Sequence, residues 1–306
     1  MRVEKLKFVK GKTGSLVKGP VRFYEPMSQH TSFRIGGPAD YWVEPRDLED
    51  LKRVLKFASA QHLPWRVLGR GTNILVGDEG FRGIIINLGE DYFQGIEFQS
   101  CRVIAGAGTL LSRLVWGVAQ QELKGLEFAV GIPGTIGGAV TMNAGTRENS
   151  LSEVVSKIEV LNGEGNISTL KRDEISFRYR GSCLSSDQVI LKVELELEAG
   201  NKRDIENLLS KFRERRNMTQ PLSESSAGCI FKNPPGGISA AELIEEAHLK
   251  GTRVGDAQVS LRHANFIVNR GKAGAGDVIS LVERIRKAVR ERSGVELELE
   301  IEVIGQ

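Results

Sequence analysis

The sequence predicts a mixed α+β protein of more than one domain, and three observations predict this class. The chain has 306 residues, which is enough for two or three domains and a sizeable core. Short apolar segments typical of buried strands alternate with longer segments whose apolar residues recur at helical spacing. Glycine occurs 35 times and clusters between these segments, where the backbone must turn with positive φ or come close to a ligand.

The chain up to residue 219 predicts strands and helices in alternation. Asp47, two residues after Pro45, is expected to cap the first helix, and the turn from Gly163 to Gly165 is expected to join two strands as a hairpin. The expected elements are, in order, a helix at 46–61, strands at 65–69, 83–88 and 101–108, a helix at 109–122, a hairpin at 155–170, a strand at 188–200 and a helix at 203–217.

The pattern changes after Pro221, and we expect a separate small α/β domain over 220–293. Gly251 and Gly294 are expected to end its two helices. The segment 294–306 is expected to be a final strand that returns to the body of the protein. The expected elements are strands at 228–234 and 264–269, helices at 239–251 and 275–294, and the final strand at 295–305.

Composition and charge argue against several classes of function. The net charge of +3 is too small to indicate a nucleic-acid partner, and the basic stretch 211–217 is interpreted as a solvated helix face. No apolar run approaches the roughly 18 residues that a membrane span requires, and the first 14 residues lack the apolar region of a secretory signal. We therefore expect a cytoplasmic protein without membrane association, and no obligate protein partner is evident.

Cysteine and histidine usage argues against disulfides and metal sites. Cys101, Cys183 and Cys229 lie far apart, and an odd number of cysteines in a reducing compartment does not form a disulfide framework. The four histidines are also scattered, and no Cys/His pair has zinc-ligand spacing. We expect no metal site, and Cys101 and Cys183 are expected only to pack.

Glycine-rich loops are the first candidates for chemistry. Successive backbone N–H groups in such loops form an anion-binding concavity that suits a pyrophosphate. The segments "GRGTNI" and "GAGTLL" begin as G-x-G but lack the third glycine of a Rossmann fingerprint, and no P-loop motif is present. Glycine spacing alone leaves a phosphate site and plain tight turns as alternatives. The glycine density of residues 131–145 favours a cofactor site.

Three other features offer charged or reactive side chains, and each has a plain structural alternative. If 176–182 is a strand, Arg178 and Arg180 share one face, where they either hold a carboxylate or enolate or are simply solvated. The final strand alternates apolar residues with four glutamates, among which periodicity selects none. Cys229 is either a small buried residue or a thiol in a binding loop.

Taken together, six segments resemble the UDP-N-acetylenolpyruvoylglucosamine reductases. They are "GRGTNILV", "GIPGTIGGAVTMNAG", "FRYRGS", "AGCIFKNP", "RHANFIVN" and "GVELELEIEVIG", in the order of the family and over nearly the whole chain. The resemblance implies non-covalent FAD in a vanillyl-alcohol-oxidase-type fold of two α/β subdomains, here 1–88 and 89–219, followed by a C-terminal α/β substrate-binding domain. It also implies NADPH as co-substrate and a small-molecule UDP-sugar as substrate.

The resemblance implies an enzyme that reduces UDP-N-acetylglucosamine enolpyruvate to UDP-N-acetylmuramate for peptidoglycan synthesis. Reduced FAD would give a hydride to the enolpyruvyl β-carbon, and Cys229, where many members have serine, would give a proton to the α-carbon. Arg180, which follows the tyrosine of F-x-Y-R-x-S, and Glu300, the second glutamate of G-V-x-L-E-x-E, would stabilise the developing charge. An unperturbed thiol has a pKa of about 8.5, which suits a proton donor.

The resemblance also implies binding residues by position. FAD contacts are expected from Arg34, Gly69, Arg70, Gly71, Thr72, Asn73, Gly131, Pro133, Gly134, Thr135, Gly137, Gly138, Ala139, Asn143 and Gly145. Substrate contacts are expected from Tyr179, Arg213, Arg216, Lys232, Asn233 and His263, with Arg215 and Arg262 as further candidates. Only 48 residues separate Arg180 from Cys229, a spacing that resembles the subgroup without a substrate-covering tyrosine loop.

Two other functions stay open at the level of the sequence. Another flavoprotein of the same fold, such as an oxidase or an alcohol dehydrogenase, often attaches its flavin covalently through histidine or cysteine. A nucleotide-binding regulatory protein would bind the cofactor without consuming NADPH.

Overall fold

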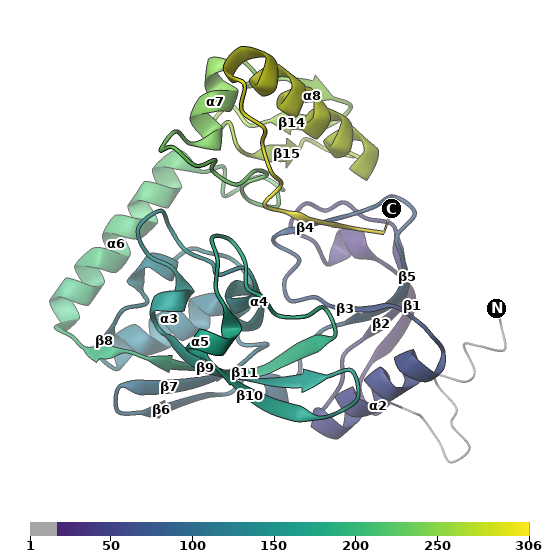
Figure 1. Ribbon diagram of the computed structural model, residues 1–306, viewed down its shortest axis with the longest axis vertical. Helices are drawn as coiled ribbons and strands as arrows, with labels where there is room; N and C mark the ends of the chain where they lie inside the picture. Colours follow the sequence, from purple (N-terminus) through teal and green to yellow (C-terminus); the bar gives the residue numbers. More distant parts are fainter. Residues whose placement is uncertain (1–16, 306) are drawn as a thin grey trace. The chain divides into compact units, whose positions relative to one another are not determined.

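The computed structural model describes residues 17–305, which form two compact units, each discontinuous in sequence (Figure 1). Unit 1 consists of the described residues up to Tyr24, together with Asp40–Gly69 and Arg82–Arg213. Unit 2 consists of Glu25–Ala39, Arg70–Phe81 and the described residues from Glu214 onward. Each unit therefore draws on three stretches of the chain. The N-terminal segment, in which we expected no secretory signal, lies outside the described residues.

The first sheet has four strands and lies largely in unit 1. Its order is β1 (Val21–Pro26), β2 (Pro38–Val43), β5 (Phe81–Ile86) and β3 (Trp65–Val67). Helix α2 (Leu48–Ala60) follows β2 along the chain (Figure 1). It buries Leu51, Val54 and Leu55, which recur at helical spacing, in a core shared with the strands. The side chain of Asp47 accepts the N–H of Asp50 at 2.8 Å, which confirms the expected cap.

The second sheet has five antiparallel strands and belongs to unit 1. Its order is β10 (Ile167–Lys171), β9 (Val155–Asn162), β11 (Gln188–Glu196), β7 (Arg102–Gly106) and β6 (Ile96–Gln99). The expected hairpin is confirmed as β9 and β10, in which Leu161 lies opposite Ile167. Helix α3 (Leu111–Gln120) matches the expected helix, and helix α4 (Ile136–Thr141) packs against β7 and β11. The sheet therefore supports the glycine-rich block that contains α4.

The expected long strand at 188–200 is divided in the structure. After β11, the short strand β12 (Glu198–Ala199) pairs with β8 (Leu123–Lys124). Helix α6 (Lys202–Thr219) follows and buries Ile205 and Leu209, whereas most of its basic stretch is exposed, as expected for a solvated face. The remaining short helices of the chain are η1 (Met27–Gln29), η2 (Asp91–Phe93), η3 (Glu127–Ala129), η4 (Leu151–Glu153) and α5 (Arg172–Ile175).

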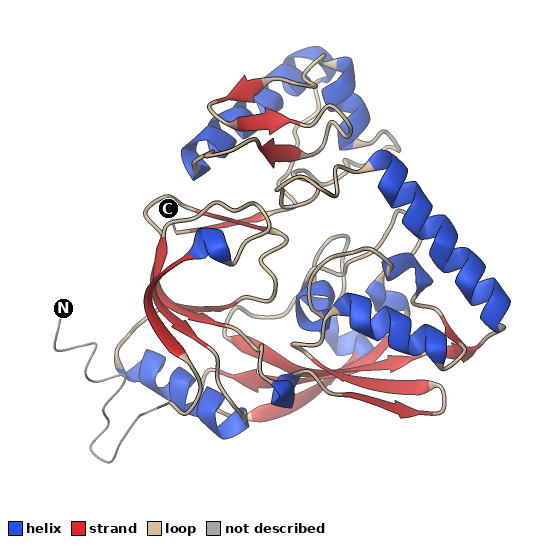
Figure 2. Ribbon diagram, turned by 180° about the vertical axis from the view of Figure 1, so that it is seen from behind, coloured by secondary structure: helices blue, strands red, loops and turns tan. Residues whose placement is uncertain are grey.

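Unit 2 contains a small antiparallel sheet with two helices (Figure 2). The strands are β13 (Arg253–Val254), β14 (Ala257–Val259) and β15 (Ile267–Asn269), in that order, and the helices are α7 (Ala240–Glu246) and α8 (Ala275–Ser293). Helix α8 packs against α7, β13 and β14. Gly294 ends α8 in a left-handed conformation with φ of +71°, as expected, whereas α7 ends five residues before Gly251.

The C-terminal segment forms a shorter strand than expected. Strand β16 (Glu302–Ile304) pairs in parallel with β4 (Ile74–Val76) within unit 2. Residues 295–301 keep the alternation of burial, since Leu297 and Ile301 are buried, but they are irregular and bridge to a neighbour at Leu299. The expectation of one continuous strand is wrong, because alternation determines the buried face and not whether a neighbouring strand supplies hydrogen-bond partners.

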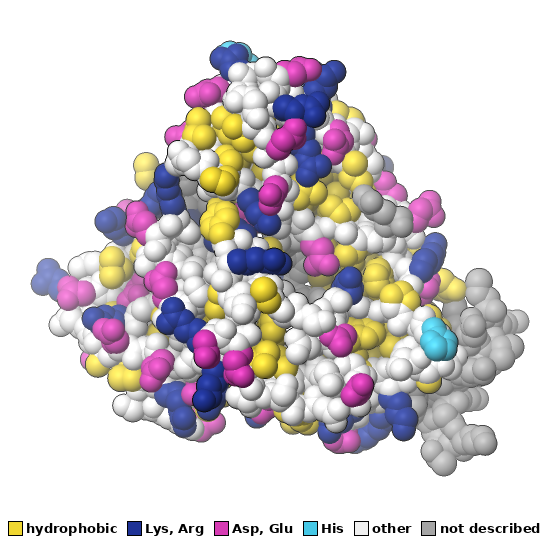
Figure 3. Space-filling view, in the orientation of Figure 1, with side chains coloured by type: hydrophobic (Ala, Val, Ile, Leu, Met, Phe, Trp, Pro, Cys, Tyr) yellow, Lys and Arg dark blue, Asp and Glu magenta, His cyan; other side chains and the backbone are white. Residues whose placement is uncertain are grey.

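The surface carries charges of both signs. On the face shown in Figure 3, basic and acidic side chains are interspersed, in keeping with the small net charge of +3. None of the helices formed by residues 17–305 combines the length and apolar character that crossing a membrane requires.

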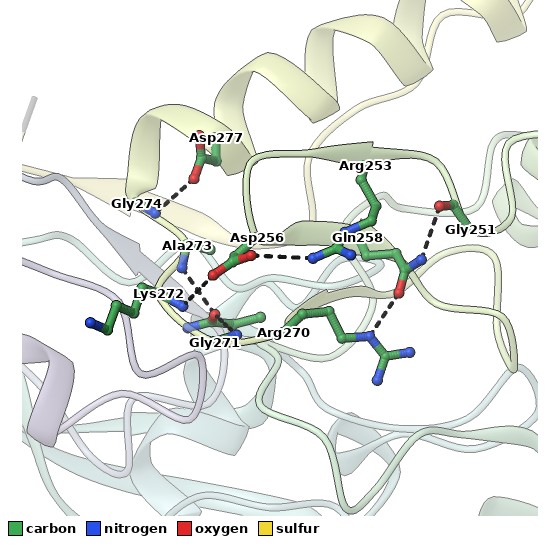
Figure 4. Close-up of polar contacts among 11 residues, drawn as sticks. Gly251, Arg253, Asp256, Gln258, Arg270, Gly271, Lys272, Ala273, Gly274 and Asp277 are labelled. Atoms are coloured by element: carbon green, nitrogen blue, oxygen red, sulfur yellow. Dashed lines mark hydrogen bonds and ion pairs between the residues drawn. The ribbon is translucent and has the colours of Figure 1, made fainter.

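Asp256 organises the loop that leads from β15 into α8 (Figure 4). Its carboxylate accepts the N–H of Lys272 at 2.8 Å and pairs with the guanidinium of Arg253 at 3.2 Å. The carboxylate of Asp277 accepts the N–H of Gly274 at 3.1 Å at the start of the helix. These contacts fix the entry of the chain into α8.

Candidate active site

Cys229 lies in an extended segment of unit 2 with a neighbouring segment on either side. On one side Cys229 bridges to Phe266, and the N–H of Ile230 donates to the carbonyl of Asn265 at 2.9 Å. On the other side the N–H of Glu300 donates to the carbonyl of Ile230 at 2.8 Å. Isolated bridges thus replace the strand expected at 228–234. The structure brings the predicted proton donor and the predicted catalytic glutamate onto adjacent segments.

Asn265, which was not among the residues predicted from the sequence, holds the Cys229 segment in place. Its side chain is 3% exposed. Its Oδ1 accepts the N–H of Phe231 at 2.9 Å, and its Nδ2 donates to the carbonyl of Phe231 at 2.8 Å. The side chain thus acts as a strand partner for one residue. The signal in the sequence was a polar residue among the apolar positions of "ANFIV".

Burial distinguishes Glu300 from the other three alternating glutamates. Those three are exposed, whereas Glu300 is half-buried. Glu298 forms an ion pair with Lys232 at 3.5 Å, and the side chain of Asn73 donates to the carbonyl of Glu300 at 3.1 Å. The glycine-rich segment that contains Asn73 is therefore hydrogen-bonded directly to the backbone of Glu300, within unit 2.

His263 packs beside the partner of Cys229. Its ring meets that of Phe266 edge to face with centroids 4.8 Å apart, and its Nδ1 accepts the N–H of Asn265 at 3.3 Å. Burial, and next the charge of Lys250, hold the pKa of His263 below its ordinary value. The imidazole is therefore disposed to be neutral, which agrees with a ring nitrogen that accepts a hydrogen bond.

The loop 70–73 in unit 2 offers backbone donors. Gly71 has φ of +58°, and a Cβ there would lie 2.2 Å from the carbonyl oxygen of His30, so a side chain does not fit. The N–H groups of Arg70 and Gly71 donate to no acceptor among the described residues. Ser32 donates its N–H to the carbonyl of Gly71 at 3.0 Å, which places the turn that carries Arg34 beside this loop.

The block 131–145 in unit 1 likewise contains glycines that have no room for a side chain and N–H groups that lack an acceptor in the described part of the chain. A Cβ on Gly69 would lie 2.6 Å from Oγ1 of Thr135, and a Cβ on Gly137 would lie 2.9 Å from that of Ala107. The N–H groups of Gly134 and Thr135 have no acceptor among the described residues. Neither loop contains a carboxylate in the stretches 69–73 and 131–139. Closely packed backbone with free donors and no negative charge fits the pyrophosphate of FAD.

Arg180 lies on a tight turn in unit 1. The N–H of Arg178 donates to the carbonyl of Gly181 at 3.0 Å, and the N–H of Gly181 returns to the carbonyl of Arg178 at 3.2 Å. Arg180 is the third residue of this turn and has φ of +53°, a position that favours glycine. The expected strand with both arginines on one face is wrong, because the chain reverses between them.

The side chain of Arg180 contacts a neighbouring carbonyl and an aromatic ring in unit 1. Its Nη2 donates to the carbonyl of Gly145 at 3.0 Å, and its guanidinium carbon lies 5.1 Å from the ring centroid of Tyr179. An open pocket of about 380 Å³ lies beside the turn, between the loop 146–153 and residues 177–180. The exposed side chains of Arg178 and Tyr179 line it. This pocket offers guanidinium and phenol groups to a polar ligand.

The predicted site residues are divided between the two units. Arg180, Tyr179 and Arg213 belong to unit 1, whereas Cys229 and Glu300 belong to unit 2. The predicted FAD residues in unit 1 are Gly69, Gly131, Pro133, Gly134, Thr135, Gly137, Gly138, Ala139, Asn143 and Gly145, and those in unit 2 are Arg34, Arg70, Gly71, Thr72 and Asn73. The other predicted substrate residues, all in unit 2, are Arg216, Lys232, Asn233 and His263.

Known proteins resemble the chain over both units. Residues 39–171 match the model of the FAD binding domain, and residues 220–304 match that of the UDP-N-acetylenolpyruvoylglucosamine reductase C-terminal domain. The UDP-N-acetylenolpyruvoylglucosamine reductase of Clostridioides difficile (strain 630) is 44% identical over 292 residues, which cover 95% of each chain. That of Moorella thermoacetica is 45% identical over 282 residues, 92% of each chain. The chain belongs to this reductase family.

A solved structure of the family agrees with this assignment. The crystal structure of UDP-N-acetylenolpyruvylglucosamine reductase from Thermus caldophilus matches with a TM-score of 0.81 at 40% identity, over 94% of this chain and 98% of that one. The expected α+β fold, with a vanillyl-alcohol-oxidase-type FAD-binding region and a C-terminal α/β domain, is confirmed. As a member of the reductase family with an FAD binding domain, the chain is an FAD-dependent oxidoreductase.

Proposed function

We propose that this chain reduces UDP-N-acetylglucosamine enolpyruvate to UDP-N-acetylmuramate with NADPH, in the synthesis of peptidoglycan precursors. The observation that carries the proposal is that Cys229 and Glu300 lie on neighbouring segments, which are joined by the 2.8 Å hydrogen bond from the N–H of Glu300 to the carbonyl of Ile230. A thiol and a carboxyl group supplied by neighbouring segments suit the protonation of an enolate. The cytoplasmic location expected from the sequence is part of this proposal.

The two glycine-rich segments would hold FAD, which when bound relays a hydride from NADPH to the β-carbon of the enolpyruvyl group. The free N–H groups of Arg70 and Gly71 suit a pyrophosphate, and Arg34 lies on the turn whose Ser32 N–H binds the carbonyl of Gly71. In unit 1 the free N–H groups of Gly134 and Thr135 offer a second set of donors.

Three side chains would act on the substrate. Arg180 would offset the negative charge that develops at the α-carbon and its carboxylate, and removing one such donor costs about 2.7–4 kcal/mol. Glu300, in its protonated form, would donate a hydrogen bond to the same enolate. Cys229 would transfer the proton of its Sγ to the α-carbon. One hydride and one proton are then added across the carbon–carbon double bond.

Each unit offers candidate groups for the uridine diphosphate. In unit 2, Lys232 and His263 lie on or beside the Cys229 segment, and Arg216 lies on α6. Asn233 accepts the N–H of Ala240 at 3.0 Å through Oδ1, so Nδ2 is the side-chain group that it would offer to the substrate. Tyr179 and Arg213 are exposed in unit 1. Arg215, exposed on α6, stays a further candidate, whereas Arg262 is less suitable because its guanidinium binds the carbonyls of Asn217 and Met218.

The test is NADPH oxidation by the purified protein on addition of UDP-N-acetylglucosamine enolpyruvate, with the product identified by mass spectrometry. We expect oxidation that depends on the substrate and a product heavier by two hydrogen atoms. NADPH that is bound but not consumed would overturn the proposal in favour of a regulatory protein. Flavin that stays attached after denaturation would favour an oxidase of the same fold.

A further inference from the structure

We propose that Asn143 is a positioning residue for Arg180 and acts through the turn that carries the arginine; this inference rests on the proposed function. Asn143 lies two residues after the last residue of α4, Thr141, and is 6% exposed. Its φ is +42°, a left-handed conformation that asparagine tolerates better than most side chains. A buried polar side chain in this conformation needs partners for both its oxygen and its nitrogen.

Both polar atoms of the Asn143 side chain bind the backbone of other segments. Nδ2 donates to the carbonyl of Arg178 at 3.0 Å, and Oδ1 accepts the N–H of Ser152 at 3.0 Å. The carbonyl of Arg178 also accepts the N–H of Gly181, the bond that closes the turn around Arg180. Asn143 therefore reinforces the closure of this turn and ties it to the loop at Ser152.

Two further hydrogen bonds join the same pair of segments. The hydroxyl of Ser182, which is 8% exposed, donates to the carbonyl of Thr141 at 3.0 Å. The guanidinium of Arg180 donates to the carbonyl of Gly145 at 3.0 Å. Residues 141–145 thus hold the turn at three points. Since this segment ends the block expected to hold FAD, the block and the arginine form one connected piece within unit 1.

The turn requires such support because Arg180 has a left-handed backbone conformation that disfavours any residue with a Cβ. Conformations of this kind persist where the surrounding structure over-determines them. We call the three hydrogen bonds between residues 141–145 and the turn the clamp. Without the clamp, the turn would relax and the guanidinium of Arg180 would shift from the place where charge develops. A displacement of about 1 Å in a positioned group can cost about 100-fold in rate.

The proposal changes the role expected for Asn143. From the resemblance it would contact FAD. In the structure, each polar atom of its side chain already binds a backbone group of the protein. Its contribution to catalysis therefore runs through Arg180.

Two substitutions separate the hydrogen bonds from the backbone conformation. Asn143→Gly keeps the left-handed conformation and removes both bonds, whereas Asn143→Asp keeps an acceptor for Ser152 but turns an oxygen toward the carbonyl of Arg178. We expect both variants to slow the reoxidation of the flavin by substrate by about 10- to 100-fold. The FAD dissociation constant and the rate of flavin reduction by NADPH should stay close to those of the wild type.

A double-mutant cycle tests whether the effect runs through Arg180. Arg180→Lys should slow the reoxidation of the flavin by substrate much less in the Asn143→Gly variant than in the wild type, because the misplaced arginine has already lost its effect. Cys229→Ser serves as the control, and its effect should multiply with that of Asn143→Gly. Amide hydrogen exchange at Gly181 should be faster in Asn143→Gly, a readout that does not depend on activity.

Several results would overturn the proposal. These are an Asn143→Asp enzyme with the wild-type rate, effects of Asn143→Gly and Arg180→Lys that multiply, or equal losses in FAD affinity and both half-reactions. The last result would make Asn143 a cofactor contact. If the wild type does not reduce the substrate, the proposed function fails, and the exchange rate at Gly181 still tests the clamp.

Discussion

Arg180 combines the side chain of a proposed catalytic residue with an unfavourable backbone conformation. Its φ of +53° costs a residue with a Cβ about 1–2 kcal/mol. We therefore expect the free energy of unfolding of Arg180→Gly to be about 1 kcal/mol higher than that of Arg180→Ala, because glycine removes the strain. Urea unfolding of the two variants measures the difference. Both should be inactive in substrate reduction, and equal stabilities would mean that this backbone is not strained.

Substitution of Cys229 should slow the half-reaction with substrate and leave the half-reaction with NADPH nearly unchanged. General acid catalysis contributes about 10²–10⁴ to a rate. We expect Cys229→Ala to lose about this factor in the reoxidation of the flavin by substrate, while its reduction by NADPH is nearly unchanged. Stopped-flow absorbance of the flavin measures both rates. Cys229→Ser should keep substantial activity, since a hydroxyl can also donate a proton. Equal losses in both half-reactions would contradict the role of proton donor.

His263 should make stability depend on pH. Its pKa in the folded protein is lowered from 6.5, first by burial, so the unfolded chain binds the proton more readily. Stability therefore falls as the pH drops below 6.5 and is unaffected by this group above that value. We expect His263→Gln to lose less stability than the wild type between neutral and mildly acidic pH. Urea midpoints at several pH values measure this, with His62→Gln, an exposed histidine in unit 1, as the control.

Helix α8 receives its N-terminal cap from a distant part of the chain. Its N-cap is Gly274, which has no side chain to offer. The carboxylate of Asp78 accepts the N–H of Ala275 at 2.8 Å and that of Gly276 at 3.1 Å. We expect Asp78→Ala to lower the free energy of unfolding by about 1 kcal/mol. The neighbouring exposed Glu79 is the matched control, and Glu79→Ala should change it little. Equal effects would mean that the cap is not stabilising.

The helices were predicted better than the strands, because helix signals are local. The Asp47 cap, the spacing of Leu51 and Leu55, and Gly294 at the end of α8 all act within a few residues. The strands expected at 176–182 and 295–305 failed, because a ladder needs a partner that the strand's own residues do not specify. At 176–182 the chain instead folds back on itself.

The sequence predicted which residues belong to the candidate site, but it did not predict how they are arranged in space. The resemblance named Cys229 and Glu300, but the bond that makes their segments neighbours joins residues far apart in the chain. Glycine patterns predicted loops that leave N–H groups free. They did not predict the positive φ of Arg180, nor that Asn143 and Asn265 use their side chains to hold functional segments. Such contacts appear only once distant segments pack.

Unit 2 has a core that depends on two early segments of the chain. Phe33, Ile35 and Leu75 are at most 3% exposed and pack in the same cluster as the buried face of α8. Strand β4, which contains Leu75, is also the partner of β16. The fold of residues after 220 is therefore linked to residues that precede it by about 150 positions or more. The domain boundary at 220 stays a prediction that an expressed fragment can test.

A fragment of residues 220–306 should not fold cooperatively by itself. It lacks three buried side chains, each of which contributes about 1.5–3 kcal/mol by burial, and it lacks the strand that pairs with β16. Their loss is comparable with the 5–15 kcal/mol that stabilises a typical protein. We expect circular dichroism to show a broad, gradual thermal transition. In the full chain, Phe33→Ala should lower the free energy of unfolding by about 3–5 kcal/mol. A fragment with a sharp transition would mean that the core after residue 220 is self-sufficient.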